Sequence, residues 1–368
     1  MGANSRLSKL GSFGQSVWYD NITRQMLQDG SLAKIVSKGV VGLTSNPTIF
    51  EKAIGSGSLY DADIKRFSKS SLNKAQIFEN LAVQDIKEAA DLMLSVYRDT
   101  QYTDGMVSLE VNPHLAYNTK DTILEARRLH KSVDRPNLMI KVPATDEGIP
   151  AITALIGEGI NVNVTLIFST EMYSKVREAY ITGLTQLLKN GGDVSSVSSV
   201  ASFFVSRVDT EVDTVLSEMP PTSRLATGKA ALSNAIVAYN DFQSTFQSDR
   251  FKKLSKQGAR VQRPLWASTS TKNPDFHDLL YVESLIGPDT VNTMPDATLE
   301  AFMDHGKPAL NITDDVEDAR RHLELLAHAG VDMPTLTKKL LEDGVKSFAD
   351  SFNQILINIG SKQEAVSV

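Results

Sequence analysis

A single lysine lies inside a short apolar run of the chain. The run 138–143 reads Leu-Met-Ile-Lys-Val-Pro, so Lys141 has aliphatic neighbours on both sides. Such a run is typical of a parallel strand that is buried on both faces. A desolvated amine loses its proton more easily and then attacks carbonyl carbons, which would make Lys141 a Schiff-base lysine. The alternative is a lysine at the strand end that reaches water or pairs with an acid.

Other apolar runs carry polar residues where a purely structural strand favours apolar ones. Two rows of alternate residues share one face of their run, namely Asn163, Thr165 and Ile167 in the first and Ser202, Phe204 and Ser206 in the second. Further polar residues end three earlier runs: Asp20, the triplet Thr44-Ser45-Asn46, and Glu110. One such residue is more often a cap or a satisfied core group, but several that converge on a lysine at the C-terminal ends of strands favour an active site.

Two carboxylates, Asp20 and Glu110, are suitable general acids or bases beside a Schiff base. Forming a carbinolamine, dehydrating it and cleaving a carbon–carbon bond all require proton transfers. Each carboxylate also has a structural alternative. Asp20 could cap a helix that begins near Ile22, and Glu110 could form an ion pair with Lys141.

Two cations follow the later runs. Arg207 comes directly after the sixth run, and Lys272 follows the seventh together with the hydroxyl of Ser270. An arginine fork with hydroxyls and a second cation suits a phosphate monoester. The alternative for Arg207 is a surface ion pair with Asp209 or Glu211.

The elements that would position these residues are eight short apolar runs separated by helical stretches: 17–19, 40–43, 106–111, 138–142, 162–168, 200–205, 265–268 and 291–294. Eight strands alternating with helices predict an α/β fold, a (β/α)8 TIM barrel with extra helices. Helical periodicity is clear at 75–97 and 119–130.

We expect a single α/β barrel domain over residues 1–368. Helical insertions of this domain are expected at about 51–104 and 208–260, and C-terminal helices at about 297–357 are expected to pack on the barrel. The last helix, 334–357, has an apolar stripe that would lie across a barrel face. The polar segment 360–368 is expected to fray.

Composition excludes several classes of protein. The 368 residues carry a net charge of −6, which argues against a nucleic-acid partner, because binding phosphate backbones requires clustered excess cations. There is no cysteine, which removes disulfides, thiolate metal sites and cysteine nucleophiles. No histidines pair at helical spacing for zinc, and no dinucleotide or phosphate loop is present. Without a signal peptide or an apolar span, we expect a soluble cytoplasmic protein with no membrane partner.

Five motifs in order along the chain resemble the transaldolase family, which has a class I aldolase type of barrel. They are Gly-Leu-Thr-Ser-Asn-Pro-Thr-Ile-Phe at 42–50, Val-Ser-Leu-Glu-Val at 107–111, Ile-Lys-Val-Pro-Ala-Thr at 140–145, Asn-Val-Thr-Leu-Ile-Phe-Ser at 163–169 and Ser-Phe-Phe-Val-Ser-Arg at 202–207. The resemblance covers nearly the whole chain. It implies transfer of a dihydroxyacetone unit from sedoheptulose 7-phosphate to glyceraldehyde 3-phosphate, in the non-oxidative pentose phosphate pathway, with no metal or organic cofactor.

The resemblance also implies a role for each candidate residue. Lys141 forms the Schiff base, Asp20 takes the hydroxyl proton during cleavage, and Glu110 with Thr165 positions a water. The residues implied to bind the sugar phosphate are Asn46, Asn163 and Ser202 for the dihydroxyacetone unit, Phe204 for the shape of the site, and Arg207 for the phosphate. Many members of the family have a second phosphate-binding arginine after the seventh strand, where this chain has Ser270 and Lys272.

Three functions are compatible with these residues. The first is the transferase, and the second is a fructose 6-phosphate aldolase that releases free dihydroxyacetone. They differ in whether the enamine is protonated before an acceptor arrives. The third is a catalytically silent barrel that serves as a binding module; its mark would be the loss of Lys141, Asp20 or Glu110, and all three are present. The sequence leaves the oligomeric state, monomer or homodimer, open.

Overall fold

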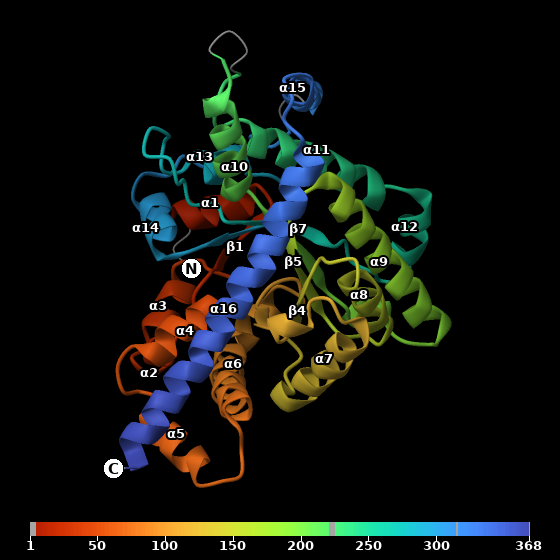
Figure 1. The fold of residues 1–368 in the computed structure, drawn as a ribbon. Helices are drawn as coiled ribbons and strands as arrows, with labels where there is room; N and C mark the ends of the chain where they lie inside the picture. The colour runs from red at the N-terminus through yellow and green to blue at the C-terminus, as the bar shows by residue number, and fades with distance from the viewer. Residues whose placement is uncertain (1–4, 221–224, 314–315, 368) are drawn as a thin grey trace.

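Eight parallel strands close into a barrel in the computed structural model, which describes residues 5–220, 225–313 and 316–367 (Figure 1). Neighbouring strands follow chain order, and β8 pairs with β1. The strands are β1 (Gln15–Tyr19), β2 (Gly42–Leu43), β3 (Val107–Glu110), β4 (Leu138–Pro143), β5 (Val162–Ile167), β6 (Ser199–Phe204), β7 (Arg263–Ala267) and β8 (Thr290–Met294). Each strand overlaps one predicted run, so the predicted (β/α)8 barrel is confirmed.

Helices separate the strands on the outside of the barrel. Those that precede β5 are α1 (Arg6–Ser12), α2 (Arg24–Gln28), α3 (Ser31–Ser37), α4 (Pro47–Gly55), α5 (Asp61–Ser68), α6 (Lys74–Asp99), the short η1 (Pro113–Leu115), α7 (Thr119–Val133) and α8 (Gly148–Gly157). Those that follow β5 are α9 (Thr170–Lys189), η2 (Val194–Ser196), α10 (Ser206–Glu218), α11 (Ala230–Phe246), α12 (Asp249–Ser255), α13 (Leu280–Ser284), α14 (Asp296–His305), α15 (Val316–His328) and α16 (Met333–Ser367). The two long gaps between strands are helical, as predicted. Residues 314 and 315, within the region predicted to hold the C-terminal helices, lie outside the described residues.

The barrel wall requires close packing at its shortest strand. In β2 a side chain on Gly42 would place its Cβ only 2.4 Å from the ring of Trp18, which is fully buried in β1. Glycine therefore lets the indole lie flat against the neighbouring strand. The residues of β4 and β5 are buried along their whole length, as expected for parallel strands covered by helices.

A β-bulge in β5 changes one predicted row of side chains. Val164 pairs with Ala201, but Ile167 pairs with Phe203, so β5 has one residue more than β6 over this stretch. Leu166 absorbs the extra residue with a φ of 60°, in the left-handed region. Ile167 therefore shares the outward face of Phe203, which packs on Tyr173 of α9, and its predicted inward position is wrong. Ser206 is also outside its predicted row, because β6 ends at Phe204 and α10 begins at Ser206.

The last helix, α16, is longer than predicted. The expected fraying is wrong for residues 360–367, because the helix continues to Ser367, and residue 368 lies outside the described residues. Its polar end docks on α5: Lys362 Nζ donates to Gly57 O at 2.7 Å and to Asp61 at 2.6 Å. Ile359 is completely buried. The polar end of the helix is therefore held against α5 by the contacts of Lys362 and by the burial of Ile359 just before it.

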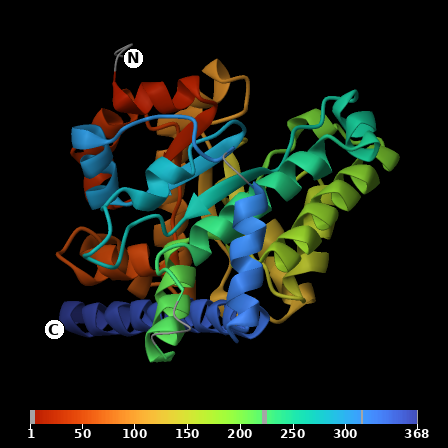
Figure 2. The ribbon, with the colours of Figure 1, turned by 90° about the horizontal axis from the view of Figure 1, so that it is seen from above.

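This helix crosses the barrel at the ends of the strands where the predicted site residues lie. Figure 1 shows α16 running diagonally in front of the strands, and Figure 2 shows it along one side of the molecule with the N-terminus on the opposite side. Gly344 approaches Leu166 so closely that a Cβ there would lie 2.9 Å from the leucine side chain. The prediction that this helix lies across a barrel face is confirmed. In the described part of the chain, no helix combines the length and the apolar character needed to span a bilayer.

Candidate active site

Lys141 lies at the centre of the barrel mouth. Strand register places Glu110 on β3, Lys141 on β4 and Asn163 on β5 side by side. The lysine side chain is only 5% exposed, and its Nζ is 3.3 Å from Glu110 Oε2 and donates to Ser45 O at 3.1 Å. The amine is therefore buried and not at a solvated strand end. The ion pair with Glu110 is present, so that structural alternative is confirmed, and the pair also keeps the carboxylate next to the amine.

Both carboxylates lie in buried environments that shift their pKa values. Burial raises the pKa of Asp20, and Lys141, a hydrogen bond from Thr44 and Arg207 partly offset this. Burial also raises the pKa of Glu110, with Lys141 acting in the opposite direction. Asp20 Oδ1 accepts a hydrogen bond of 2.7 Å from Thr44 Oγ1. Asp20 is not a helix cap, because Thr23 caps α2, so Asp20 is available to a substrate.

Three polar residues of β5 and β6 continue the site beside the lysine. Ser202 Oγ donates to Asn163 Oδ1 at 2.7 Å, and Asn163 Nδ2 donates to Ser108 Oγ at 3.0 Å. The hydroxyl of Thr165 is buried and has no hydrogen-bond partner within the described residues. Because a buried hydroxyl without a partner is costly, Thr165 is suited to bind a group that enters the site.

Asn46 serves both the fold and the site. Its Oδ1 caps α4 by accepting from Ile49 N at 3.1 Å, and Pro47 follows at the first helical position. The cap fixes the orientation of the side chain and leaves the amide NH2 group as a donor. Asn46 lines the same cavity as Lys141.

The predicted cations lie on the far wall of the site. The Arg207 guanidinium stacks 5.3 Å from the ring centroid of Phe204 and makes no ion pair with any described residue. Its proposed surface partners are engaged elsewhere, since Asp209 accepts from Ala231 N and Glu211 pairs with Lys339. The surface alternative for Arg207 is therefore wrong.

The second cation and its neighbouring hydroxyl come from the loop after β7. Lys272 is exposed and makes no ion pair with any described residue, and the Oγ of Ser270 is 2.9 Å from Thr298 Oγ1. Both line the cavity with Arg207. Cations without protein anions at the rim of a cavity are suited to an anionic ligand.

The predicted residues meet around one cavity of about 530 Å³. Those that line it are Asp20, Asn46, Lys141, Thr165, Ser202, Phe204, Arg207, Ser270 and Lys272. Asn163 lies beneath this lining, bonded to Ser202. Glu110 contacts Lys141 from the opposite side and lines a second cavity. The volume is ample for a sugar phosphate in extended form.

Among the lining residues that were not predicted from the sequence, Phe348 and Lys52 are notable for their contact and their charge. Phe348 of α16 places its ring centroid 5.5 Å from Lys141 Nζ, so the tail helix covers the amine. Lys52 lies on α4 one turn after Thr48, and Ser56, the residue that ends this helix, lines the same cavity. The spacing of Thr48 and Lys52 by one helical turn was a signal for Lys52. The apolar stripe of the last helix includes Phe348, but it does not predict the contact of this ring with Lys141.

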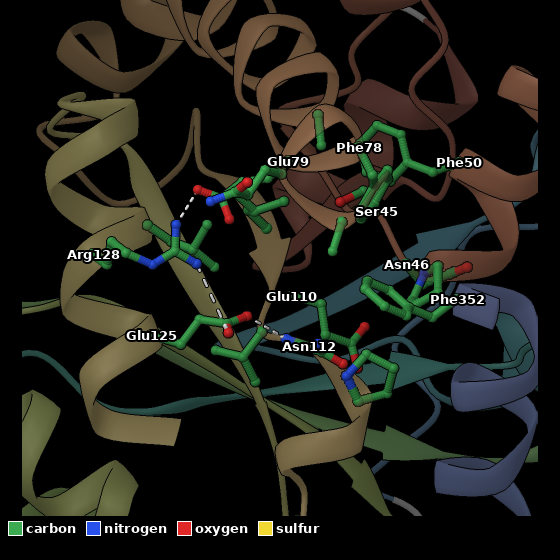
Figure 3. Close-up of a pocket in the computed structure, with 18 of the residues that line it drawn as sticks. Ser45, Asn46, Phe50, Phe78, Glu79, Glu110, Asn112, Glu125, Arg128 and Phe352 are labelled. Atoms are coloured by element: carbon green, nitrogen blue, oxygen red, sulfur yellow. Dashed lines mark hydrogen bonds and ion pairs between the residues drawn. The ribbon is translucent and has the colours of Figure 1, made fainter. Parts of the chain in front are cut away.

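Behind Glu110 lies a second cavity of about 310 Å³, shown in Figure 3. The ring of Phe78 packs edge-on against both Phe50 and Phe352 on one side of it, with centroid distances of 5.7 and 5.6 Å. On the other side, Asn112 N donates to a carboxylate oxygen of Glu125 at 2.7 Å. Because Glu110 lines this cavity and contacts Lys141, it lies between this cavity and the one that Lys141 lines. Figure 3 shows it between the polar and the aromatic sides.

The fold and the site together define an α/β-barrel enzyme built around a buried lysine. A family model described as Transaldolase/Fructose-6-phosphate aldolase matches residues 17–359. The chain therefore belongs to this family, as the motifs predicted.

Curated relatives are similar over nearly their full length. A transaldolase of Parafrankia sp. strain EAN1pec is 49% identical over 356 residues, which is 96% of each chain. A transaldolase of Thermobifida fusca is 47% identical over 98% of this chain and 99% of its own, and one of Mycobacterium tuberculosis is 44% identical over 96% of each chain. These relatives confirm the predicted enzyme class and favour transaldolase over the aldolase alternative.

Proposed function

We propose that the chain transfers a dihydroxyacetone unit between sugar phosphates, with Lys141 as the covalent nucleophile. The observation that carries this proposal is the amine itself, which is buried between Glu110 and Ser45 O at the floor of a cavity with cations at its rim. The amine attacks C2 of the ketose phosphate, and loss of water gives an iminium. The iminium then accepts the electron pair of the breaking C3–C4 bond, which leaves an enamine on the lysine.

Asp20 is the base that starts the cleavage. In its carboxylate form it takes the proton of the C4 hydroxyl, and the aldose phosphate leaves. Its raised pKa makes the carboxylate a stronger base for this step, and the proton it has taken is given back when the acceptor aldehyde is attacked. The hydrogen bond from Thr44 keeps the carboxylate oriented toward the cavity.

Glu110 and Thr165 handle the water that is lost and regained. The Thr165 hydroxyl lacks a protein partner, and Glu110 contacts the lysine on which the carbinolamine forms. A water held between them can give up or take a proton at the carbinolamine oxygen.

The remaining residues hold the sugar. Asn46 donates from its free amide and Ser202 presents its hydroxyl to the three-carbon unit, while Asn163 fixes Ser202. Phe204 shapes the wall beneath Arg207, and Arg207, Ser270 and Lys272 bind the phosphate at the other end. An Arg fork can bind two phosphate oxygens, whereas Lys272 adds charge without that geometry.

Transfer requires the enamine to survive until an acceptor arrives. The ring of Phe348 lies over Lys141 and shields the amine on the side of α16. An apolar cover limits the access of bulk water, whose protons would convert the enamine into a hydrolysable imine. This arrangement supports transfer over release of dihydroxyacetone.

Borohydride reduction tests the proposed intermediate. The enzyme is incubated with fructose 6-phosphate and borohydride, and the peptides are mapped by mass spectrometry. We expect a three-carbon adduct on Lys141, and no turnover or adduct in a folded Lys141→Ala variant. A run without borohydride, with erythrose 4-phosphate as acceptor, distinguishes transfer from release by whether free dihydroxyacetone appears. An adduct on another lysine, or full activity in Lys141→Ala, would refute the assignment.

A further inference from the structure

Two histidines and an aspartate from separate segments come together outside the active site. His277 and Asp278 lie in the loop after β7, and His305 is the last residue of α14. Asp278 Oδ1 is 3.6 Å from His277 Nδ1 and 3.2 Å from His305 Nε2, and the three ligand atoms lie within 4.8 Å of one another. No helical spacing in the sequence predicts this group, because 27 residues separate Asp278 from His305.

We propose that these three side chains bind one divalent transition-metal ion of the zinc type, with water as its remaining ligand. Tetrahedral zinc with bonds of about 2.0–2.1 Å separates its ligand atoms by about 3.3 Å. The two distances from Asp278 Oδ1 are close to this value. The nitrogens of His277 and His305 come into range by small side-chain rotations, which their exposure permits.

The surroundings of His305 prepare it as a ligand. Its Nδ1 is 3.1 Å from Asp304 Oδ2, so with an ion bound the ring would keep its N–H at Nδ1 on Asp304 and bind the ion through Nε2, which faces Asp278. A carboxylate behind a metal-binding histidine is the usual outer partner in zinc sites. His277 must give up a hydrogen bond of 3.2 Å from Leu279 N to its Nδ1.

The ion would tie together two segments that also reach the active site. Thr271 Oγ1 donates to the carbonyls of His277 and Asp278 at 2.9 and 3.0 Å. The next residue, Lys272, lines the substrate cavity, and Ser270 is bonded to Thr298 of α14. A metal bridge from the loop to His305 is thus a second link between the same loop and the same helix. Ordering this loop before substrate binds lowers the entropic cost of binding.

Metal binding is tested without substrate. Chelator-treated enzyme is titrated with Zn²⁺ in equilibrium dialysis and compared with the variants His305→Ala and His328→Ala. His328 is an exposed histidine of α15 outside the cluster, which makes it the matched control. We expect one ion per chain in the wild type and in His328→Ala, and affinity at least about tenfold weaker in His305→Ala. Equal affinity in His305→Ala, or an equal loss in His328→Ala, would overturn the metal site.

The effect on the loop rests on the proposed role of Lys272 in phosphate binding, and it has its own readout. Zn²⁺ should lower KM for fructose 6-phosphate by about fivefold in the wild type, the low end of ordinary coupling between two sites. In His305→Ala, Zn²⁺ should leave KM unchanged. Zn²⁺ that binds at the cluster without changing the wild-type KM would overturn the coupling alone. Failure of the borohydride experiment would refute the proposed function and leave the dialysis result unaffected.

Discussion

Thr44 connects Asp20 to the neighbouring wall of the barrel. Its hydroxyl donates to Asp20 Oδ1 at 2.7 Å and lies 2.8 Å from the hydroxyl of Thr293, from which it can accept. Replacement by valine keeps the shape of the side chain and removes only the hydroxyl. Because the lost bond stabilises the carboxylate form, the pKa of Asp20 rises further above its usual range in the Thr44→Val variant.

The size of the effect follows from the kind of bond that is lost. A hydrogen bond to a charged group contributes about 1.5–3 kcal/mol. That free energy shifts the ionisation equilibrium of Asp20 by a factor of about ten to a hundred. Asp20 acts as a base in its carboxylate form, so at a pH on the acid limb of the kcat profile the variant should be slower by the same factor. At alkaline pH, where the carboxylate forms in both proteins, kcat should be nearly equal.

The assay is the pH dependence of kcat for transfer from fructose 6-phosphate to erythrose 4-phosphate. The control is Thr293→Val, which keeps the bond from Thr44 to Asp20 and should leave the acid limb close to that of the wild type. An acid limb in Thr44→Val at the wild-type pH would refute the role of this bond. A loss of kcat that is equal at every pH would mean that Thr44 affects geometry and not the ionisation of Asp20.

Three further substitutions test other parts of the site and the fold. Lys272→Ala should raise KM about tenfold for fructose 6-phosphate but little for dihydroxyacetone. The control Lys131→Ala, outside the cavity, should change neither KM. Equal changes in KM for the two substrates in Lys272→Ala would remove Lys272 from the phosphate site. Glu110→Gln should lower kcat by about 10²–10⁴-fold, as expected for the loss of an acid–base group, and a wild-type kcat would exclude that role. Ile359→Ala should lower the free energy of unfolding in urea by about 2–5 kcal/mol, because the side chain is buried. The control Ile357→Ala removes an exposed side chain and should lower it by less than about 0.5 kcal/mol. Equal losses in the two variants would contradict the docking of the tail.

The barrel could be predicted because its strands leave a strong pattern. Parallel strands covered by helices are apolar on both faces, so each appears as a continuous run in the sequence. The pattern overestimates the length of a strand where a residue is buried but does not pair with the neighbouring strand. Val40 is fully buried, yet β2 pairs only over Gly42–Leu43, so the predicted run is longer than the strand.

The site could be predicted where it depends on alternation along a strand. Lys141, Ser202 and Phe204 all lie on the inward face that their spacing predicts. Beyond Thr165 the prediction fails because Leu166 adopts a left-handed conformation that a leucine rarely takes. A bulge of this kind has no composition signal when the residue is not glycine, and it reverses the side on which every later residue of the strand lies.

The tail shows the limit of the sequence most clearly. An apolar stripe establishes that a helix buries one face, but not what that face covers. In α16, Ile359 anchors the polar end on α5 while Phe348, eleven residues earlier and about 16 Å along the axis, lies over the reactive amine. A helix is rigid over this distance, so contacts of Lys362 with α5 help to hold Phe348 in place. The segment that composition assigns to fraying therefore supports the cover of Lys141, the proposed nucleophile. The hydrogen bond responsible, from Lys362 to Asp61, joins residues 301 positions apart.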